Sequence, residues 1–292
     1  MRRFSVPLPD RGGAIAGIAF GDADRPIDAL FLHANGYNAL TYRALLAPLG
    51  RDCHVVAIDQ RGHGKTTLPA SPHGRRDYAD LVLDLVALCQ ALGITRTVLA
   101  GHSMGGTVCL LAAQALEPVT GGLLLLDPPM LLPTEQALCT AALDGDPASN
   151  PLYAAAANRR ATFRNRAEAL AHYRGRGSFA TWPDEPLVDY VTDGFIERQG
   201  AVALACPPPW EACNFLAHDN AVWNALAALR RPAYILVPQQ GGVCRVGHDR
   251  APASSLLVSL EHLAGTSHFL PMERPDLVRT RLRAIIAETM VN

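Results

Sequence analysis

The 292-residue chain lacks an excess of charge of either sign. Its 26 lysines and arginines nearly balance its 27 aspartates and glutamates, which leaves a formal net charge of −1. Proteins that bind nucleic acid or an anionic membrane surface usually carry a surplus of basic residues. The composition therefore gives no electrostatic reason to expect binding to nucleic acid or to an anionic membrane. We expect a small-molecule substrate and no nucleic acid.

Long uninterrupted apolar segments are also missing. No stretch approaches the roughly 18 to 20 apolar residues that a membrane-spanning helix needs. The N-terminal segment carries two arginines, but Pro7, Pro9 and Asp10 interrupt the residues that follow, which is not the pattern of a secretory signal. We therefore expect no membrane span and a cytoplasmic location.

Paired cysteine motifs are absent as well. The seven cysteines are odd in number, scattered and mostly inside apolar segments, a distribution typical of reduced, buried thiols. Cys206, Cys213 and His218 could form a metal cluster, but no C-x-x-C spacing supports one. We expect neither a metal site nor a cofactor.

The first half of the chain alternates between apolar strands and helices. Apolar residues recur at helical spacing over 78–92, which predicts an amphipathic helix. Short apolar runs that end in polar loops predict strands at 14–20, 29–33, 53–59, 97–100, 123–126, 234–237 and 256–263. Buried strands separated by helices indicate an α/β fold with a parallel sheet covered on both faces.

This alternation stops after Pro129. Residues from about 130 to 225 look helical and show no clear strand. Within them, an amphipathic pattern over 187–198 predicts a helix, and the proline-rich 206–210 predicts a stiff extended turn. We therefore divide the chain into an α/β core, residues 1–129 and 226–292, and a helical cap, residues 130–225, inserted after the strand at 123–126, which we take as the sixth strand of the sheet.

A G-x-S-x-G motif, Gly101-His102-Ser103-Met104-Gly105, lies between the predicted strand at 97–100 and a stretch of small residues that predicts a helix. A serine in such a strand–turn–helix is held in a strained conformation that exposes its hydroxyl, and the flanking glycines avoid collisions. We therefore predict that Ser103 is a nucleophile.

A serine hydroxyl needs a general base and a group that orients the base. His268 follows the last predicted strand and precedes the last helix, so we predict it as the base. The acid is Asp127, directly after the strand at 123–126, or Asp249, further along the chain. Both preserve the order Ser, Asp, His, and we prefer Asp127 because the end of a strand shares the rim with Ser103.

The loop after the strand at 29–33 should supply a second oxyanion donor. The main-chain amide of Asn35, together with that of Met104 at the start of a helix, can point at one oxygen atom. Candidate residues of the substrate pocket are His33, Tyr37, His102 and Trp210. We expect His33 to brace its loop rather than carry protons, and Arg61 to hold neighbouring loops by ion pairing.

Four ordered motifs carry a resemblance to a known superfamily. They are His33-Ala34-Asn35-Gly36, Asp59-Gln60-Arg61-Gly62-His63-Gly64, Gly101-His102-Ser103-Met104-Gly105-Gly106 and Gly265-Thr266-Ser267-His268. Because it has these four motifs in this order, the chain resembles the lid-bearing branch of the α/β-hydrolase fold superfamily. The resemblance implies a mostly parallel eight-stranded sheet flanked by helices, with Ser103 as nucleophile and His268 as base.

The chain departs from the superfamily's pattern in two places. Ala34 replaces the first glycine usual in the oxyanion loop, and the loop after the strand at 234–237, the seventh strand of the superfamily's sheet, has no carboxylate. Some members of the superfamily place the acid after the sixth strand, which agrees with Asp127. Position 103 is a serine rather than an aspartate, so the branches that resemble haloalkane dehalogenases and epoxide hydrolases are not indicated.

The leading hypothesis is a serine esterase, lactonase or thioesterase acting on a small, largely apolar substrate, as a monomer or a homodimer. An alternative on the same fold is a cofactor-free oxygenase or lyase that uses the His268–Asp127 pair to abstract a proton. A third is a ligand-binding protein that keeps the triad as a relic.

The predicted cap is rich in arginine, with six between residues 159 and 176. They could attract an anionic substrate, although we favour a solvated helix face.

Overall fold

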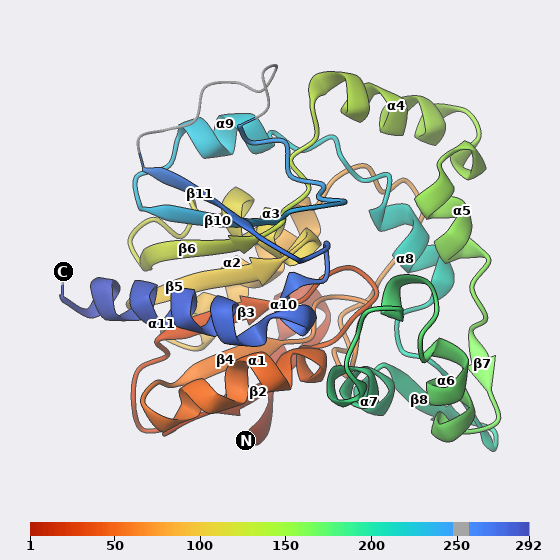
Figure 1. Ribbon diagram of the computed structural model, residues 1–292, viewed down its shortest axis with the longest axis horizontal. Helices are drawn as coiled ribbons and strands as arrows, with labels where there is room; N and C mark the ends of the chain where they lie inside the picture. Colours follow the sequence, from red (N-terminus) through yellow and green to blue (C-terminus); the bar gives the residue numbers. More distant parts are fainter. Residues whose placement is uncertain (248–256, 292) are drawn as a thin grey trace.

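The computed structural model describes residues 1–247 and 257–291. At its centre lies an eight-stranded sheet with the strand order β1-β2-β4-β3-β5-β6-β10-β11 (Figure 1). The strands span Arg2–Leu8 (β1), Gly13–Phe20 (β2), Ala29–Leu32 (β3), Val55–Ile58 (β4), Thr97–His102 (β5), Thr120–Leu126 (β6), Ala233–Pro238 (β10) and Val258–Leu263 (β11). The sheet confirms the predicted α/β class, and β1 adds an edge strand that the sequence analysis does not identify.

Strand direction determines where the loops of the sheet meet. β2 pairs antiparallel with both β1 and β4, and the other neighbouring strands are parallel. Nearly every residue of β3, β5, β6 and β10 is buried, as expected for parallel strands covered on both faces. Because the carboxyl ends of parallel strands share one edge, the loops that follow these strands converge there.

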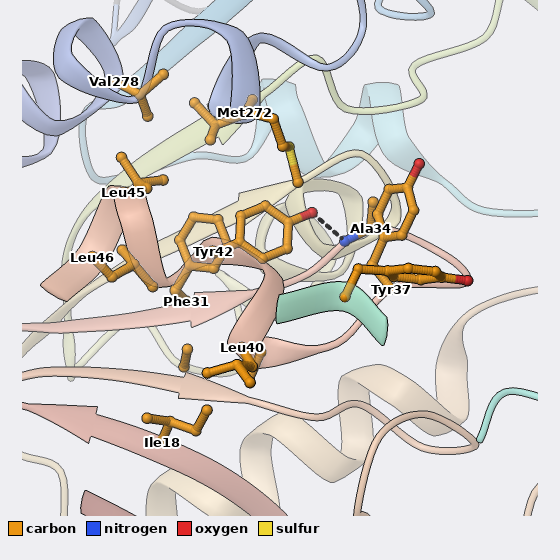
Figure 2. Close-up of a cluster of buried hydrophobic side chains, with 14 of the residues drawn as sticks. Ile18, Phe31, Ala34, Tyr37, Leu40, Tyr42, Leu45, Leu46, Met272 and Val278 are labelled. Carbon is orange, nitrogen blue, oxygen red and sulfur yellow. Dashed lines mark hydrogen bonds between the residues drawn. The ribbon is translucent and has the colours of Figure 1, made fainter. Parts of the chain in front are cut away.

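Helices cover both faces of the sheet. On one face Phe31, Leu45 and Val278 belong to a hydrophobic cluster that packs α1 and α11 against the strands (Figure 2). On the other face Val108 and Leu226 belong to a second cluster, beneath α2, α3 and α9. These helices span Arg43–Leu46 (α1), Ala79–Ala91 (α2), Met104–Ala112 (α3), Val222–Ala227 (α9) and Pro275–Val291 (α11), and the short α10, Leu270–Glu273, precedes α11.

Between β6 and α9 the chain leaves the central sheet and forms the right-hand part of the molecule (Figure 1). Three short antiparallel strands there pair in the order β7-β9-β8. The elements span Pro133–Asp144 (α4), Pro151–Ala157 (α5), Thr162–Phe163 (β7), Arg166–Tyr173 (α6), Asp184–Asp193 (α7), Phe195–Arg198 (β8), Ala201–Leu204 (β9) and Pro208–Asn214 (α8).

Three expectations for this segment are wrong. It contains strands, although none is expected. The helix predicted over 187–198 ends at Asp193, and β8 follows, closed by a tight turn in which Gln199 and Gly200 have φ of 47° and 79°. The extended turn predicted over 206–210 becomes helical at Pro208, because the first turn of a helix accepts proline.

Helix α9 crosses position 225, where the predicted cap ends. It lies beside β10 and β11 rather than with α4 to α8 (Figure 1), and its Val222 and Leu226 are buried in the core cluster shared with α3. The helical layer of the core therefore begins a few residues before the expected boundary.

Two further features concern membranes and thiols. None of the helices in the described ranges has both the length and the apolar character needed to cross a bilayer. All seven cysteines are buried as free thiols.

Candidate active site

Ser103 lies in a strained turn between β5 and α3. Its φ of 52° and ψ of −124° are unusual for a residue with a side chain. The turn is tight enough to require the neighbouring glycines. A Cβ on Gly101 would lie 2.4 Å from the carbonyl carbon of Gly105, and a Cβ on Gly105 would lie 2.4 Å from the carbonyl oxygen of Leu32. The motif therefore forms the strand–turn–helix that its residue types predict.

Asp127 and His268 form a close pair. Asp127 follows β6, is fully buried, and has a φ of 41°. Its Oδ2 lies 2.5 Å from Nδ1 of His268, which is in the loop between β11 and α10. The same carboxylate accepts hydrogen bonds from the main-chain amides of Val243 and Cys244, at distances of 3.0–3.1 Å. These bonds fix the carboxylate so that it holds the imidazole in one orientation.

Ser103 and His268 line one cavity of about 750 Å³. Within the described ranges no hydrogen bond joins the serine hydroxyl to the imidazole, although catalytic hydrogen bonds are often long in unliganded enzymes. The alternative acid, Asp249, lies outside the described residues. The structure thus brings together Ser103, His268 and Asp127, which come from the ends of three different strands.

The loop that follows β3 presents the main-chain N–H of Asn35. The neighbouring amides are occupied, because Gly36 donates to Nε2 of His63 at 3.0 Å and Tyr37 donates to the carbonyl of Ala34 at 3.2 Å. In the part of the chain that the structure describes, the Asn35 main-chain N–H has no acceptor. The N–H of Met104 opens α3, where the first amides have no partner within the helix. Asn35 and Met104 both offer a donor near Ser103.

A chain of buried hydrogen bonds connects this loop to His268. The Ala34 amide donates to the Tyr42 hydroxyl oxygen at 3.0 Å (Figure 2), and that hydroxyl lies 2.7 Å from Nδ1 of His102. Nε2 of His102 lies 2.8 Å from the main-chain oxygen of His268. Because a carbonyl can only accept, Nε2 of His102 carries the proton and Nδ1 accepts from Tyr42. Burial lowers the pKa of His102 well below its ordinary value and keeps the ring neutral.

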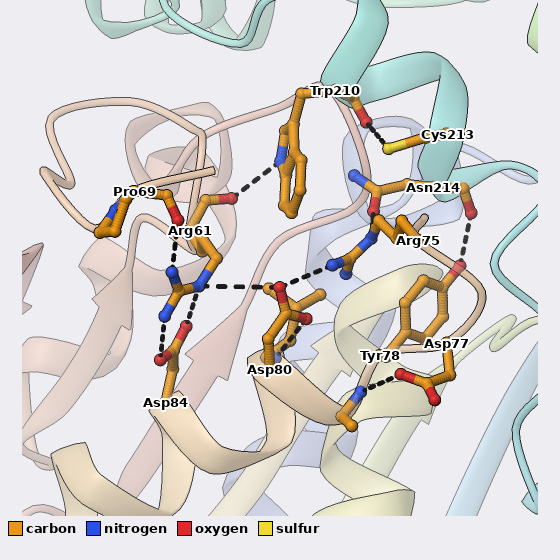
Figure 3. Close-up of polar contacts among 12 residues, drawn as sticks. Arg61, Pro69, Arg75, Asp77, Tyr78, Asp80, Asp84, Trp210, Cys213 and Asn214 are labelled. Carbon is orange, nitrogen blue, oxygen red and sulfur yellow. Dashed lines mark hydrogen bonds and ion pairs between the residues drawn. The ribbon is translucent and has the colours of Figure 1, made fainter. Parts of the chain in front are cut away.

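The turn after β4 holds the surrounding loops in place. The Arg61 guanidinium makes two bonds to the Asp84 carboxylate, at 2.7 and 2.8 Å, and donates to the carbonyl of Pro69 (Figure 3). This agrees with the ion-pairing role predicted for Arg61. His33 is fully buried, and its Nε2 accepts the main-chain N–H of Gln60 at 2.9 Å, so it braces the loop as expected.

Helix α8 is hydrogen-bonded to the loop that follows β3. The Asn35 side chain donates to the carbonyl of Glu211 at 2.8 Å and accepts from the Asn214 side chain at 3.0 Å. Asn214 in turn accepts from Nε of Arg75 at 2.6 Å, and the Trp210 indole donates to the carbonyl of Arg61 at 3.0 Å (Figure 3). Sequence reasoning does not find this role of Asn214.

The cavity has a different wall from the one predicted. Of the four candidate pocket residues, Tyr37 lines it. His33, His102 and Trp210 do not, because each is buried at 0–1% exposure and makes its polar contacts with the interior. Apolar side chains from α4 and α5 and from the segment after α8, among them Leu138, Leu152 and Phe215, form much of the wall instead. The described residues contain no cluster of three His, Cys, Asp or Glu side chains suited to a metal ion.

The sheet order and the serine turn at its carboxyl edge define an α/β-hydrolase fold. Comparison with known proteins agrees, since a model described as the alpha/beta hydrolase family matches residues 29–281. The chain belongs to the alpha/beta hydrolase family.

Individual relatives carry hydrolase names. Over 98 residues, 34% of each protein, the chain is 30% identical to 2-(acetamidomethylene)succinate hydrolase of Mesorhizobium japonicum. The matched segment thus spans about a third of the length of that relative.

Two solved structures share the fold. The crystal structure of E-2-(acetamidomethylene)succinate hydrolase has a TM-score of 0.78 at 19% identity, over 98% of this chain and 100% of that one. A thioesterase domain from the curacin biosynthetic pathway has a TM-score of 0.74 at 17% identity, over 97% and 99% of the two chains.

Proposed function

We propose that this protein is a serine hydrolase that cleaves a carboxylic ester, lactone or thioester of a small, largely apolar substrate through an acyl-enzyme on Ser103. The observation that carries the proposal is the buried Asp127–His268 pair, with its 2.5 Å contact, opening on the same cavity as Ser103. Residues 130–225 act as a cap that supplies most of the substrate's surroundings.

Each group has one role in this reaction. Ser103 Oγ attacks the carbonyl carbon while Nε2 of His268 takes its proton, and Asp127 stabilises the imidazolium that forms. The main-chain N–H groups of Asn35 and Met104 hold the oxyanion. His268 then protonates the leaving alcohol or thiol, takes a proton from water, and the resulting hydroxide attacks the acyl-enzyme. The acid leaves and Ser103 regains its proton.

We favour Asp127 as the acid because its carboxylate contacts the imidazole of His268 directly. Its Oδ2 faces Nδ1 of His268, and its other oxygen is held by the Val243 and Cys244 amides. An acid placed in this way keeps Nδ1 protonated and Nε2 free to accept the serine proton.

The test is turnover of p-nitrophenyl esters and lactones by wild type, Ser103→Ala, Asp127→Asn and Asp249→Asn. We expect Asp127→Asn to lower kcat by about 10⁴-fold and Ser103→Ala to lower it by about 10⁶-fold. Asp249→Asn should leave kcat close to that of wild type. The opposite result for the two aspartates would contradict the assignment of the acid. Ser103→Ala that keeps most turnover would instead favour the oxygenase or lyase chemistry of a His–Asp pair.

A further inference from the structure

The arginines of the cap divide into paired and unpaired side chains. Four of the six pair with carboxylates on the outer surface: Arg160 and Arg164 with Glu168, Arg166 with Glu197, and Arg174 with Asp184. None of these four lines the cavity. Arg159 and Arg176 do line it, so only two of the six can meet a substrate.

The charges on the cavity wall leave a surplus of one cation. Arg159 lies 2.5 Å from Glu211, and Arg245 lies 2.9 Å from Glu135, so these four wall residues cancel in pairs. Arg176 is exposed, and within residues 1–247 and 257–291 its guanidinium has no hydrogen-bond or ion-pair partner. A single unpaired guanidinium matches a monoanion such as a carboxylate better than a dianion.

The mouth of the same cavity carries exposed leucines. Leu138 on α4 is 72% exposed and Leu152 on α5 is 56% exposed, and both line the cavity. Large apolar side chains left open to water beside a binding cavity indicate a surface that an apolar group covers. Continuity with the cavity that contains Ser103 makes the substrate itself the occupant of this surface.

We propose that the substrate is an amphiphilic monoanion, an ester or thioester with an apolar arm against Leu138 and Leu152 and a carboxylate held by Arg176. This inference rests on the proposed function, because it describes the substrate that Ser103 attacks. The carboxylate stays ionised and takes no part in the bond changes. Its role is to select and orient the substrate.

The test uses two matched pairs of esters that place a carboxylate on either side of the scissile bond. The first is mono-p-nitrophenyl glutarate against p-nitrophenyl valerate. The second is 4-acetoxybenzoate against 4-acetoxybenzamide. We expect the ratio of kcat/KM, charged over neutral, to fall by about fivefold in Arg176→Gln for at least one pair, the size typical of a partly exposed ion pair. Arg176→Lys should retain part of this ratio, because it keeps the charge.

Arg174→Gln is the control, since Arg174 is exposed and close in sequence but lies outside the cavity wall. Its charged-over-neutral ratio should equal that of wild type. High salt should lower the wild-type ratio, because exposed charges are screened within about 10 Å at 0.1 M ionic strength. An unchanged ratio in Arg176→Gln for both pairs would overturn the proposal. Ser103-dependent hydrolysis of the neutral esters would then leave the proposed function standing.

The apolar arm has its own test. Leu138→Ser and Leu152→Ser should weaken the preference for longer acyl chains, by about fourfold in kcat/KM for each methylene that loses its contact. Leu83→Ser is the matched control, because Leu83 on α2 is 53% exposed and does not line the cavity. Equal chain-length profiles in all three variants would contradict a substrate arm at this surface.

Discussion

Two walls of the cavity are built in different ways. Helix α8 reaches the cavity through Glu211, while its Trp210 and Asn214 are buried away from the cavity and hydrogen-bonded to loops of the core. Helix α5 begins at an Asn150 side chain that caps its own first turn, and it presents the exposed Leu152 to the cavity. The first wall helps to hold the loop after β3 that carries Asn35, and the second supplies apolar surface. Mutations in the two helices should therefore have different consequences.

The largest expected difference concerns stability. Trp210 is 1% exposed, and its ring stacks 4.3 Å from the Arg75 guanidinium. Trp210→Ala should lower the free energy of unfolding by about 3–5 kcal/mol, the usual cost of emptying a buried aromatic site. Leu152→Ala should change it by no more than about 0.5 kcal/mol. Urea denaturation measures both, and equal losses would remove the distinction between the walls.

The next prediction concerns the stability of the native chain at acidic pH. Nε2 of His63 accepts a hydrogen bond from the Gly36 amide in the loop after β3, and burial lowers the pKa of His63 to about 4. The unfolded chain therefore binds a proton at His63 at higher pH than the native chain does. Stability from His63 is present above about pH 6.5 and is lost as the pH falls toward 4, at up to about 1.4 kcal/mol per pH unit.

The variant His63→Gln isolates this contribution, since glutamine keeps an acceptor and does not titrate. Nearby Asp59 acts in the opposite direction, because burial raises its pKa to about 6, so protonating it stabilises the native chain. Asp59 is present in both proteins and cancels in the difference. The wild-type advantage over His63→Gln should shrink between pH 6.5 and 4. A constant difference across that range would contradict the neutral, buried state of His63.

A smaller effect is expected from Asn214→Ala. The substitution leaves Oδ1 of Asn35 and Nε of Arg75 without their partner. We expect a loss of about 1–3 kcal/mol in the free energy of unfolding, as for other stranded buried polar groups. We also expect kcat to fall by about tenfold with little change in KM, because a displaced oxyanion donor matters in the transition state. Steady-state kinetics at a temperature well below the melting point separates the two effects.

The smallest effect is expected from Tyr42→Phe, which keeps the ring and removes the hydroxyl between Ala34 and His102. Stability should fall by about 1 kcal/mol, and kcat should fall more than KM changes. Thr120→Val is the control, since it removes a buried hydroxyl that bonds to Leu116 in the core. If Thr120→Val lowered kcat as much as Tyr42→Phe, the effect would be one of general stability.

The parts of the site that sequence patterns predict are those with a local signature. Ser103 is flanked by glycines between a strand and a helix, and Asp127 ends an apolar run just before two prolines. The pairing of Asp127 with His268, 141 positions apart, could be predicted only because both follow strands of one parallel sheet.

The support of the oxyanion loop by α8 has no such signature. Asn35 and Asn214 are 179 positions apart, and a single asparagine in a short helix carries no pattern that points to its partner. The strands β7 to β9 have no recognisable sequence pattern for a related reason, because two to four residues are too few to show an alternation of buried and exposed side chains.

The most direct measurement is intact-protein and peptide mass spectrometry after rapid quenching of the enzyme with a p-nitrophenyl ester. If Ser103 forms an acyl-enzyme, the mass of one acyl group appears on the peptide containing Ser103 and is absent from Ser103→Ala. Turnover of the ester with no acyl group on Ser103, or with the acyl group on another residue, would contradict it.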